Sequence, residues 1–228
     1  MIQIRIYRVN EIVFSRLLFS SLESSDILWA EIISNADDLQ GWSDNGNFIL
    51  DSMSPSPTMK IKSAAVLVPI IKRDKTYKIL LTKRPENMSE HAGQISFPGG
   101  KKEDFDPSPR DTALREAYEE IGLPPENVEV VGCLGNHYVR SGYRITPVVG
   151  IVNPKVNFVA NPSEVDEIIE VPLYYLLDLR NFRRKIMSSL GLSKDTFIID
   201  YKGHEIWGAT AAIIVNLRNK IRTVRQGV

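Results

Sequence analysis

The spacing of apolar residues along the chain predicts where strands and helices form. Short apolar runs bounded by charged or turn-forming residues are typical of strands, which we expect at 64–71, 77–82, 94–97, 129–134, 144–152, 167–171, 197–201 and 204–207. Apolar positions that recur every three or four residues predict helices at 109–121, after Pro172, and from 209 to about 224. Pro98 and the two glycines after it predict a loop.

This mixture of strands, hairpins and helices predicts an α+β fold or an α/β/α sandwich. The first 60 residues differ from the rest. They contain one amphipathic segment at 25–33 that suits a helix, followed by a stretch at 41–60 rich in Gly, Ser, Asn, Asp and Pro. We therefore expect an N-terminal helical extension and linker over residues 1–60 and the main domain over 61–228.

Composition excludes several classes of protein. The 28 Lys and Arg residues balance the 28 Asp and Glu residues, so a general nucleic-acid binder is not expected. No apolar run is long enough to span a membrane, and we expect a cytoplasmic protein. Three arginines in the first 16 residues leave an organellar presequence as an alternative. Cys133 lies in an apolar run and is expected to be a buried, inert thiol.

The segment at 108–122 carries its own helix start and stop signals. Ser108 suits the N-cap, Pro109 the first helical position and Asp111 a variant of the capping box. Gly122 stands where a helix C-terminus favours a left-handed residue. A helix over 109–121 is therefore expected independently of tertiary contacts.

The two sides of this helix differ in chemistry. At 100° per residue, one side carries Leu114, Ala117, Tyr118 and Ile121, which we expect to face a core. The opposite side gathers the carboxylates of Glu116, Glu119 and Glu120. Such carboxylates repel one another, and a divalent cation relieves the repulsion. Oxygen ligands suit Mg²⁺ or Mn²⁺. The alternative is a solvated acidic face without a ligand.

The neighbouring residues favour the metal site. The Gly99-Gly100 pair allows close approach of the backbone, and the string from Arg115 to Leu123 resembles the second half of the Nudix box. The first half departs from that box: Asp106 replaces Glu, and eight residues rather than seven precede Arg115. The resemblance implies the α+β class, with a Nudix-like α/β/α sandwich around a mixed sheet, and a metal-dependent pyrophosphohydrolase. It assigns Glu116 and Glu120 as metal ligands, Glu119 as ligand or base, and Arg115 to the catalytic group.

Further stretches are similar to the coenzyme A pyrophosphatase group of this superfamily. They lie at 80–84, 91–94, 97–100, 142–143, 146–150 and 206–211. The resemblance implies hydrolysis of coenzyme A or acyl-CoA to 3′-phospho-AMP and 4′-phosphopantetheine, with substrate bound by Arg84, Gly99, Gly100 and Tyr143. Pro85 and Ser89 depart from that motif, where Ser or Ala and Arg are expected. Arg140 or Arg144 can supply a missing phosphate contact.

Two other residues enter the expected site. Glu164 precedes the strand at 167–171 and can act as a further ligand or base, while His91 can position the Gly99-Gly100 loop. Two other functions stay open: another Nudix substrate, such as ADP-ribose, a dinucleotide or a nucleoside triphosphate, and a non-catalytic nucleotide-sensing module. In each case the partner is a small nucleotide diphosphate or a related molecule, and a homodimer stays among the oligomeric states considered.

Overall fold

The structure, a computed structural model, describes residues 61–74, 76–88, 91–139, 141–189 and 192–225. The expected N-terminal extension and linker lie outside these residues, so the division at residue 60 stays a prediction. None of the helices in the described ranges is long and apolar enough to cross a membrane.

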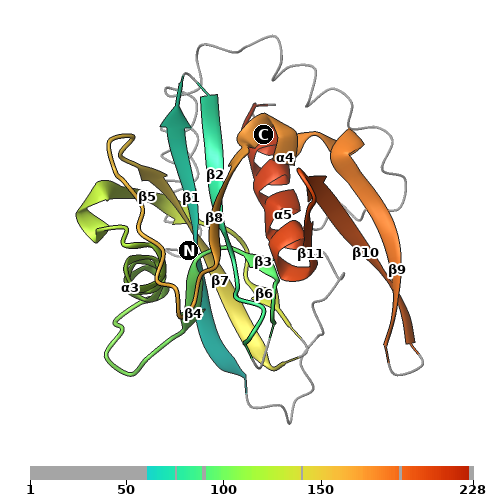
Figure 1. The fold of residues 1–228 in the computed structure, drawn as a ribbon, viewed down its shortest axis with the longest axis horizontal. Helices are drawn as coiled ribbons and strands as arrows, with labels where there is room; N and C mark the ends of the chain where they lie inside the picture. The colour runs from blue at the N-terminus through green and yellow to red at the C-terminus, as the bar shows by residue number, and fades with distance from the viewer. Residues whose placement is uncertain (1–60, 75, 89–90, 140, 190–191, 226–228) are drawn as a thin grey trace, which may run out of the picture.

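The larger of two sheets has eight strands and mixed direction (Figure 1). Its long strands are β1 (Lys62–Arg73), β2 (Thr76–Lys83), β5 (Val128–Cys133), β7 (Tyr143–Val152) and β8 (Glu167–Pro172). Three short strands complete it: β3 (Ile95–Ser96), β4 (Gly99–Lys101) and β6 (His137–Tyr138). Strand β1 runs parallel to β7 and antiparallel to β2 and β4.

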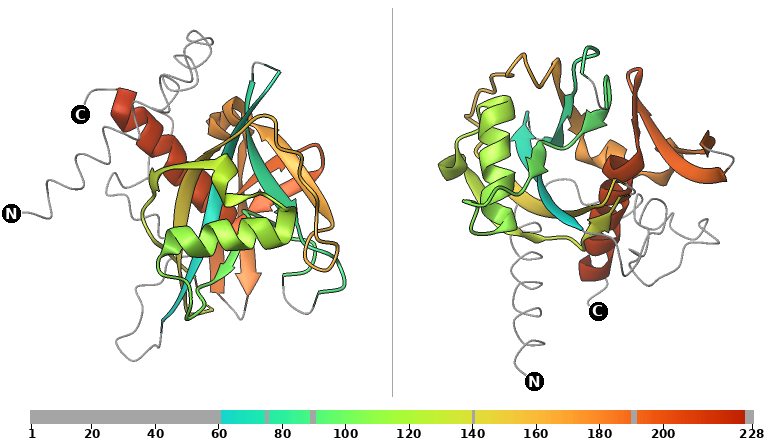
Figure 2. Two further views of the ribbon diagram at one scale, coloured as in Figure 1. Left: turned by 90° about the vertical axis from the view of Figure 1, so that its left-hand side faces the viewer. Right: turned by 90° about the horizontal axis from the view of Figure 1, so that it is seen from below.

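A smaller three-stranded sheet follows near the C-terminus. It contains β9 (Phe182–Ser189), β10 (Leu192–Tyr201) and β11 (His204–Trp207), in the order β11-β10-β9. Helix α4 (Leu173–Leu177) and two 3-10 turns (Pro125–Asn127 and Leu179–Asn181) join the larger elements. Figure 2 shows helix α3 (Pro109–Ile121) on one side of the large sheet and α5 (Gly208–Arg225) with the smaller sheet on the other. The predicted α+β sandwich with a mixed sheet is confirmed.

Alternation along β1 builds a separate core on each face of the large sheet, because successive side chains of a strand point in opposite directions. Ala65 and Leu67 pack with the buried side of α3. Val68 and Ile70 pack with α4 and α5 on the other face. Strand β1 is therefore buried on both sides and provides the frame between the two helical layers.

Two predictions about strands are wrong. Gly99 and Gly100 are expected in a loop after Pro98, but with Lys101 they form β4, in which Gly99, Gly100 and Lys101 pair with Val66, Ala65 and Ala64. Strand β9 was not predicted, because its sequence has no sustained alternation of apolar and polar residues. Both strands are defined by pairing with partners rather than by their own residues.

Two predictions about burial are also wrong. The side chain of Tyr118 is 57% exposed, whereas Glu120 is buried, so the core-facing arc of α3 is rotated toward Glu120. Cys133 is exposed rather than buried. A β-bulge between Val130 and Gly132 shifts the register of β5, so Val131 and Leu134 face the core and Cys133 does not.

Candidate active site

Helix α3 begins and ends at the residues that the sequence predicts. Ser108 has an extended backbone, and its hydroxyl accepts a hydrogen bond from the Asp111 backbone N–H at 3.4 Å. Gly122 has a left-handed φ of 63°, and its N–H donates to the Tyr118 carbonyl at 2.9 Å. These caps fix both ends of the helix that carries the glutamates.

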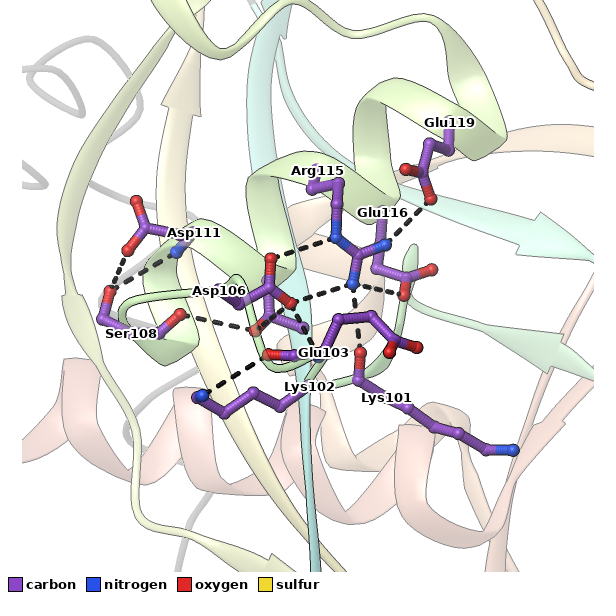
Figure 3. Close-up of polar contacts among 10 residues, drawn as sticks. Lys101, Lys102, Glu103, Asp106, Ser108, Asp111, Arg115, Glu116 and Glu119 are labelled. Carbon is purple, nitrogen blue, oxygen red and sulfur yellow. Dashed lines mark hydrogen bonds and ion pairs between the residues drawn. The ribbon is translucent and has the colours of Figure 1, made fainter.

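Asp106 anchors Arg115 beneath this helix (Figure 3). The buried Asp106 carboxylate accepts hydrogen bonds from Arg115 Nε at 3.1 Å and Nη2 at 3.0 Å. It also accepts from the Thr112 hydroxyl and the Glu103 N–H, each at 3.0 Å. Hydrogen bonding to Arg115 lowers the pKa of Asp106 to about 2. Asp106 is therefore an ionised residue that fixes Arg115, in the place where the Nudix box has glutamate.

The terminal nitrogens of Arg115 also contact neighbouring glutamates. Its Nη1 lies 2.9 Å from Glu119 Oε2, and its Nη2 lies 2.9 Å from Glu116 Oε1 (Figure 3). Nη2 also donates to the Lys101 carbonyl at 3.1 Å. One guanidinium thus links α3 to the end of β4 and orients two of the three expected glutamates.

The Glu116 carboxyl packs against β4 at Gly100, where there is no side chain. A Cβ atom on Gly100 would lie only 2.5 Å from the Glu116 carboxyl carbon, so a side chain here would displace that group. Burial raises the pKa of Glu116, and the carboxylates of Glu119 and Glu164 add to this effect, while Arg115 opposes it. Glycine is required here for close approach rather than for backbone conformation.

Glu120 is the most deeply placed of the three glutamates. Its residue is 4% exposed, and its Oε2 is buried without a hydrogen-bond partner among the described residues. Burial and the nearby Glu116 raise the pKa of Glu120 to about 8, although Arg84 and a hydrogen bond from the Gly99 N–H favour the ionised form. A buried carboxyl with an unused oxygen is a candidate ligand for a cation.

Arg84 and Glu164 reach this carboxylate group from other elements. Arg84 follows β2, and its buried Nε has no hydrogen-bond partner among the described residues. The loop that carries Glu164 is tied to α3, because the Asn161 N–H donates to the Glu120 carbonyl at 2.8 Å and the Glu164 N–H to the Asn161 carbonyl at 3.0 Å. The Glu164 carboxylate is close enough to raise the pKa of both Glu116 and Glu120.

The other expected site residues lie at the edge of these carboxylates or on other elements. Glu119 is exposed and contacts Arg115. Tyr143 begins β7, on the opposite face of the sheet from Glu116. His91 lies 2.9 Å from Gln94 through Nδ1 and Oε1, within the loop before β3. Ser89 and Arg140 lie outside the described residues.

Sequence reasoning did not identify every group that holds the site. The Thr112 hydroxyl and the Lys101 carbonyl both bind the Asp106–Arg115 pair, and neither was singled out. Asp106 was noted only as a departure from a motif. Its position six residues after Gly100 was the signal available for it.

Comparison with known proteins identifies the family. A model of the NUDIX domain matches residues 62–190. The chain belongs to the Nudix family of hydrolases. It is 39% identical over 160 residues to the Nudix hydrolase NudL of Yersinia pestis (strain Pestoides F), covering 70% of this chain and 80% of that protein. NudL of Yersinia pseudotuberculosis serotype O:1b (strain IP 31758) gives the same values.

A solved Nudix structure supports the fold of this Nudix hydrolase. The crystal structure of RenU from M. smegmatis matches with a TM-score of 0.50 and 21% identity, covering 71% of this chain and 86% of that chain. This similarity supports the fold, and the chemistry of the site is argued from the residues of this chain.

The carboxylates of this Nudix hydrolase fit a divalent cation in part. Within the described ranges, no three His, Cys, Asp or Glu side chains are already gathered around a common point. However, Mg²⁺ is commonly held by one or two carboxylates, with water and substrate phosphates as its other ligands. The unpartnered Glu120 Oε2 and the close approach of Glu116 to Gly100 provide such a pair.

Proposed function

We propose that this Nudix hydrolase cleaves the diphosphate of coenzyme A or acyl-CoA, yielding 3′-phospho-AMP and 4′-phosphopantetheine. The observation that carries the proposal is the position of Arg84. This residue belongs to the coenzyme A pyrophosphatase-like stretch at 80–84, and its guanidinium is close enough to Glu120 to oppose the rise in that residue's pKa. This position supports the proposal, because it puts the stretch that resembles the coenzyme A pyrophosphatase group beside the carboxylates that we assign to the metal site.

Glu116 and Glu120 are the residues we assign to hold Mg²⁺ or Mn²⁺. Burial is the main cause of the raised pKa of each carboxyl, and nearby carboxylates add to it, so the ionised pair needs a compensating positive charge. When bound, a divalent cation neutralises charge on the diphosphate oxygens and lowers the pKa of an attacking water. Glu119 is an additional candidate ligand or base.

Arg115 positions these groups rather than contacting the substrate. The Asp106 carboxylate fixes one edge of its guanidinium, while Glu116 and Glu119 lie at its terminal nitrogens. A bidentate guanidinium has a fixed planar geometry, so it holds both glutamates in defined orientations. Exchange of Arg115 for lysine would keep the charge and lose this double restraint.

Glu164 is the carboxylate best suited to accept the proton of the attacking water. It lies near Glu116 and Glu120 but comes from a separate loop, and among the described residues Arg115 pairs with Asp106, Glu116 and Glu119 rather than with Glu164. A carboxylate that is not held in an ion pair is available as a general base. Arg84, with its unpartnered Nε, supplies a donor for a diphosphate oxygen on the same side of the site.

Product analysis tests the proposed substrate. The enzyme is incubated separately with coenzyme A, ADP-ribose, NADH and ATP, each with Mg²⁺ and with Mn²⁺, and the products are separated by chromatography. We expect the highest kcat/KM for coenzyme A or an acyl derivative. A preference for ADP-ribose would overturn the coenzyme A assignment and leave the Nudix chemistry intact. Binding without turnover of any compound would favour a nucleotide-sensing module.

A further inference from the structure

We propose that Lys62, Lys101 and Tyr143 form a phosphate-binding subsite that reads a substrate phosphate other than the scissile diphosphate. The identity of that group as the 3′-phosphate of coenzyme A rests on the proposed function. The first observation is a shared contact. The Lys62 Nζ lies 5.7 Å from the centroid of the Tyr143 ring, and the Lys101 Nζ lies 5.9 Å from the same centroid.

Strand register explains how three distant residues meet. Lys62 pairs with Tyr143 across β1 and β7, while Lys101 of β4 pairs with Ala64 on the other side of β1. Because Lys62 and Ala64 are two residues apart on one strand, all three side chains emerge on the same face of the sheet. The small side chain of Ala64 leaves space for Lys101 and Tyr143 to approach each other across β1.

The charges of the two ammonium groups are not paired within the described part of the chain. Within the described ranges, neither Lys62 nor Lys101 makes an ion pair, whereas Lys78 and Lys83 each contact a carboxylate. Both lysines are exposed. Among the described residues, the group that each ammonium contacts is the face of the Tyr143 ring. Two like charges held beside one ring repel each other, and a dianionic phosphate would relieve that repulsion.

The subsite lies next to the catalytic carboxylates along β4. Gly100 faces Glu116, and the next residue, Lys101, projects its side chain to the opposite face. The Lys101 carbonyl is fixed by Arg115 at 3.1 Å, so the backbone that presents this lysine is tied to the catalytic helix. A ribose links the 5′-diphosphate and the 3′-phosphate of coenzyme A, so its two anionic groups can occupy neighbouring positions on either side of this strand.

Arg144, which the sequence also offers as a phosphate contact, lies on the opposite face of the sheet from Tyr143. Its Nη2 donates to the Ser63 hydroxyl at 3.1 Å, and Ser63 lies between Lys62 and Ala64 on β1. By strand alternation, Arg144 therefore lies on the α3 face, away from the Tyr143 ring. Lys62 and Lys101 are the cations that the structure places at Tyr143.

The test combines a double variant with a matched control. Lys62→Gln with Lys101→Gln removes both charges, whereas Lys72→Gln with Lys102→Gln removes two charges without altering the subsite. Lys72 contacts the Tyr77 ring at 5.4 Å, a similar pair at the far end of β1. For each protein, kcat/KM is measured for coenzyme A and for dephospho-coenzyme A. Calorimetry with EDTA then compares binding of adenosine 3′,5′-bisphosphate and AMP.

We expect the Lys62/Lys101 variant to lose about tenfold or more in kcat/KM for coenzyme A and little for dephospho-coenzyme A. It should also lose the preference for the bisphosphate over AMP that the control retains. Equal losses for both substrates, or a wild-type protein that binds the two nucleotides equally, would overturn the subsite. If lysine-dependent bisphosphate binding is found without coenzyme A hydrolysis, the subsite stands and the proposed substrate is wrong.

Discussion

At the scale of single residues, the surroundings hold chemically similar carboxyls in different states. Asp106 accepts four hydrogen bonds, two of them from Arg115, and its pKa is about 2. Glu120 is similarly buried, yet it has an unpartnered oxygen and a pKa of about 8. The number of donors, rather than burial alone, separates the residue that supports the site from the residue that is available for a ligand.

Asp106 gives a prediction about acid stability. Its folded pKa lies below the ordinary value, so the ionised form stabilises the fold above about pH 4, and this contribution is lost as the pH falls through 2. Asp106→Asn should lower the free energy of unfolding by about 2 kcal/mol at pH 7, because it weakens hydrogen bonds to a charged group. The deficit, measured by urea unfolding, should shrink below pH 4. The exposed Asp104→Asn serves as the control, and a deficit independent of pH would contradict this account.

In the metal-free protein, Glu120 should change stability with pH in the opposite direction to Asp106. Its folded pKa lies above the ordinary value, so stability is highest below about pH 4.5 and is lost as the pH rises through 8. With EDTA present, Glu120→Gln should be as stable as the wild type at pH 5 and more stable at pH 8. Thermal unfolding at both pH values measures this difference, with the exposed Glu129→Gln as the control. A variant that is less stable at pH 8 would show that the ionised carboxylate supports the fold.

At the scale of elements, local sequence signals are sufficient to predict α3 but not β4. The caps of α3 lie within three residues of its ends, so the sequence determines both boundaries. Strand β4 has only three residues and exists through its pairing with β1. The rotation of α3 about its axis was also missed, because the sheet beneath the helix decides that Glu120 is buried and Tyr118 is not.

The two glycines of β4 should respond differently to alanine. A Cβ on Gly99 would lie 2.4 Å from the Ala65 carbonyl oxygen, and backbone there cannot move without disturbing β1. Gly99→Ala should therefore destabilise the fold by about 1–3 kcal/mol. The three atoms nearest to a Cβ on Gly100 all belong to the Glu116 carboxyl, which can swing away, so Gly100→Ala should mainly weaken metal-dependent activity.

Two measurements separate these effects. Urea unfolding gives the stability of each variant, and titration of the hydrolysis rate with Mg²⁺ gives its metal dependence. Gly135→Ala is the control, because its Cβ would meet only Asn216 Nδ2 at an ordinary 3.9 Å. Equal destabilisation by Gly99→Ala and Gly100→Ala, with unchanged Mg²⁺ dependence, would contradict the assignment of Gly100 to the positioning of Glu116.

At the scale of the whole molecule, the sheet brings together groups that are distant in sequence. Arg84 follows β2, Glu116 and Glu120 lie on α3, and Glu164 comes from a loop bonded to the end of that helix. The sequence predicted these residues by type and by resemblance to a family. It could not predict that Tyr143 lies on the other face of the sheet beside Lys62 and Lys101, because that position depends on the register of three strands.

The most direct test of the account is the rate of coenzyme A hydrolysis by Glu120→Gln at saturating Mg²⁺. This exchange preserves the shape of the buried side chain and removes the charge that we assign to the metal site. We expect kcat to fall by about two orders of magnitude or more, while Glu129→Gln retains the wild-type rate. A near-normal rate for Glu120→Gln, with the protein folded by circular dichroism, would contradict the central claim that this carboxylate is part of the catalytic metal site.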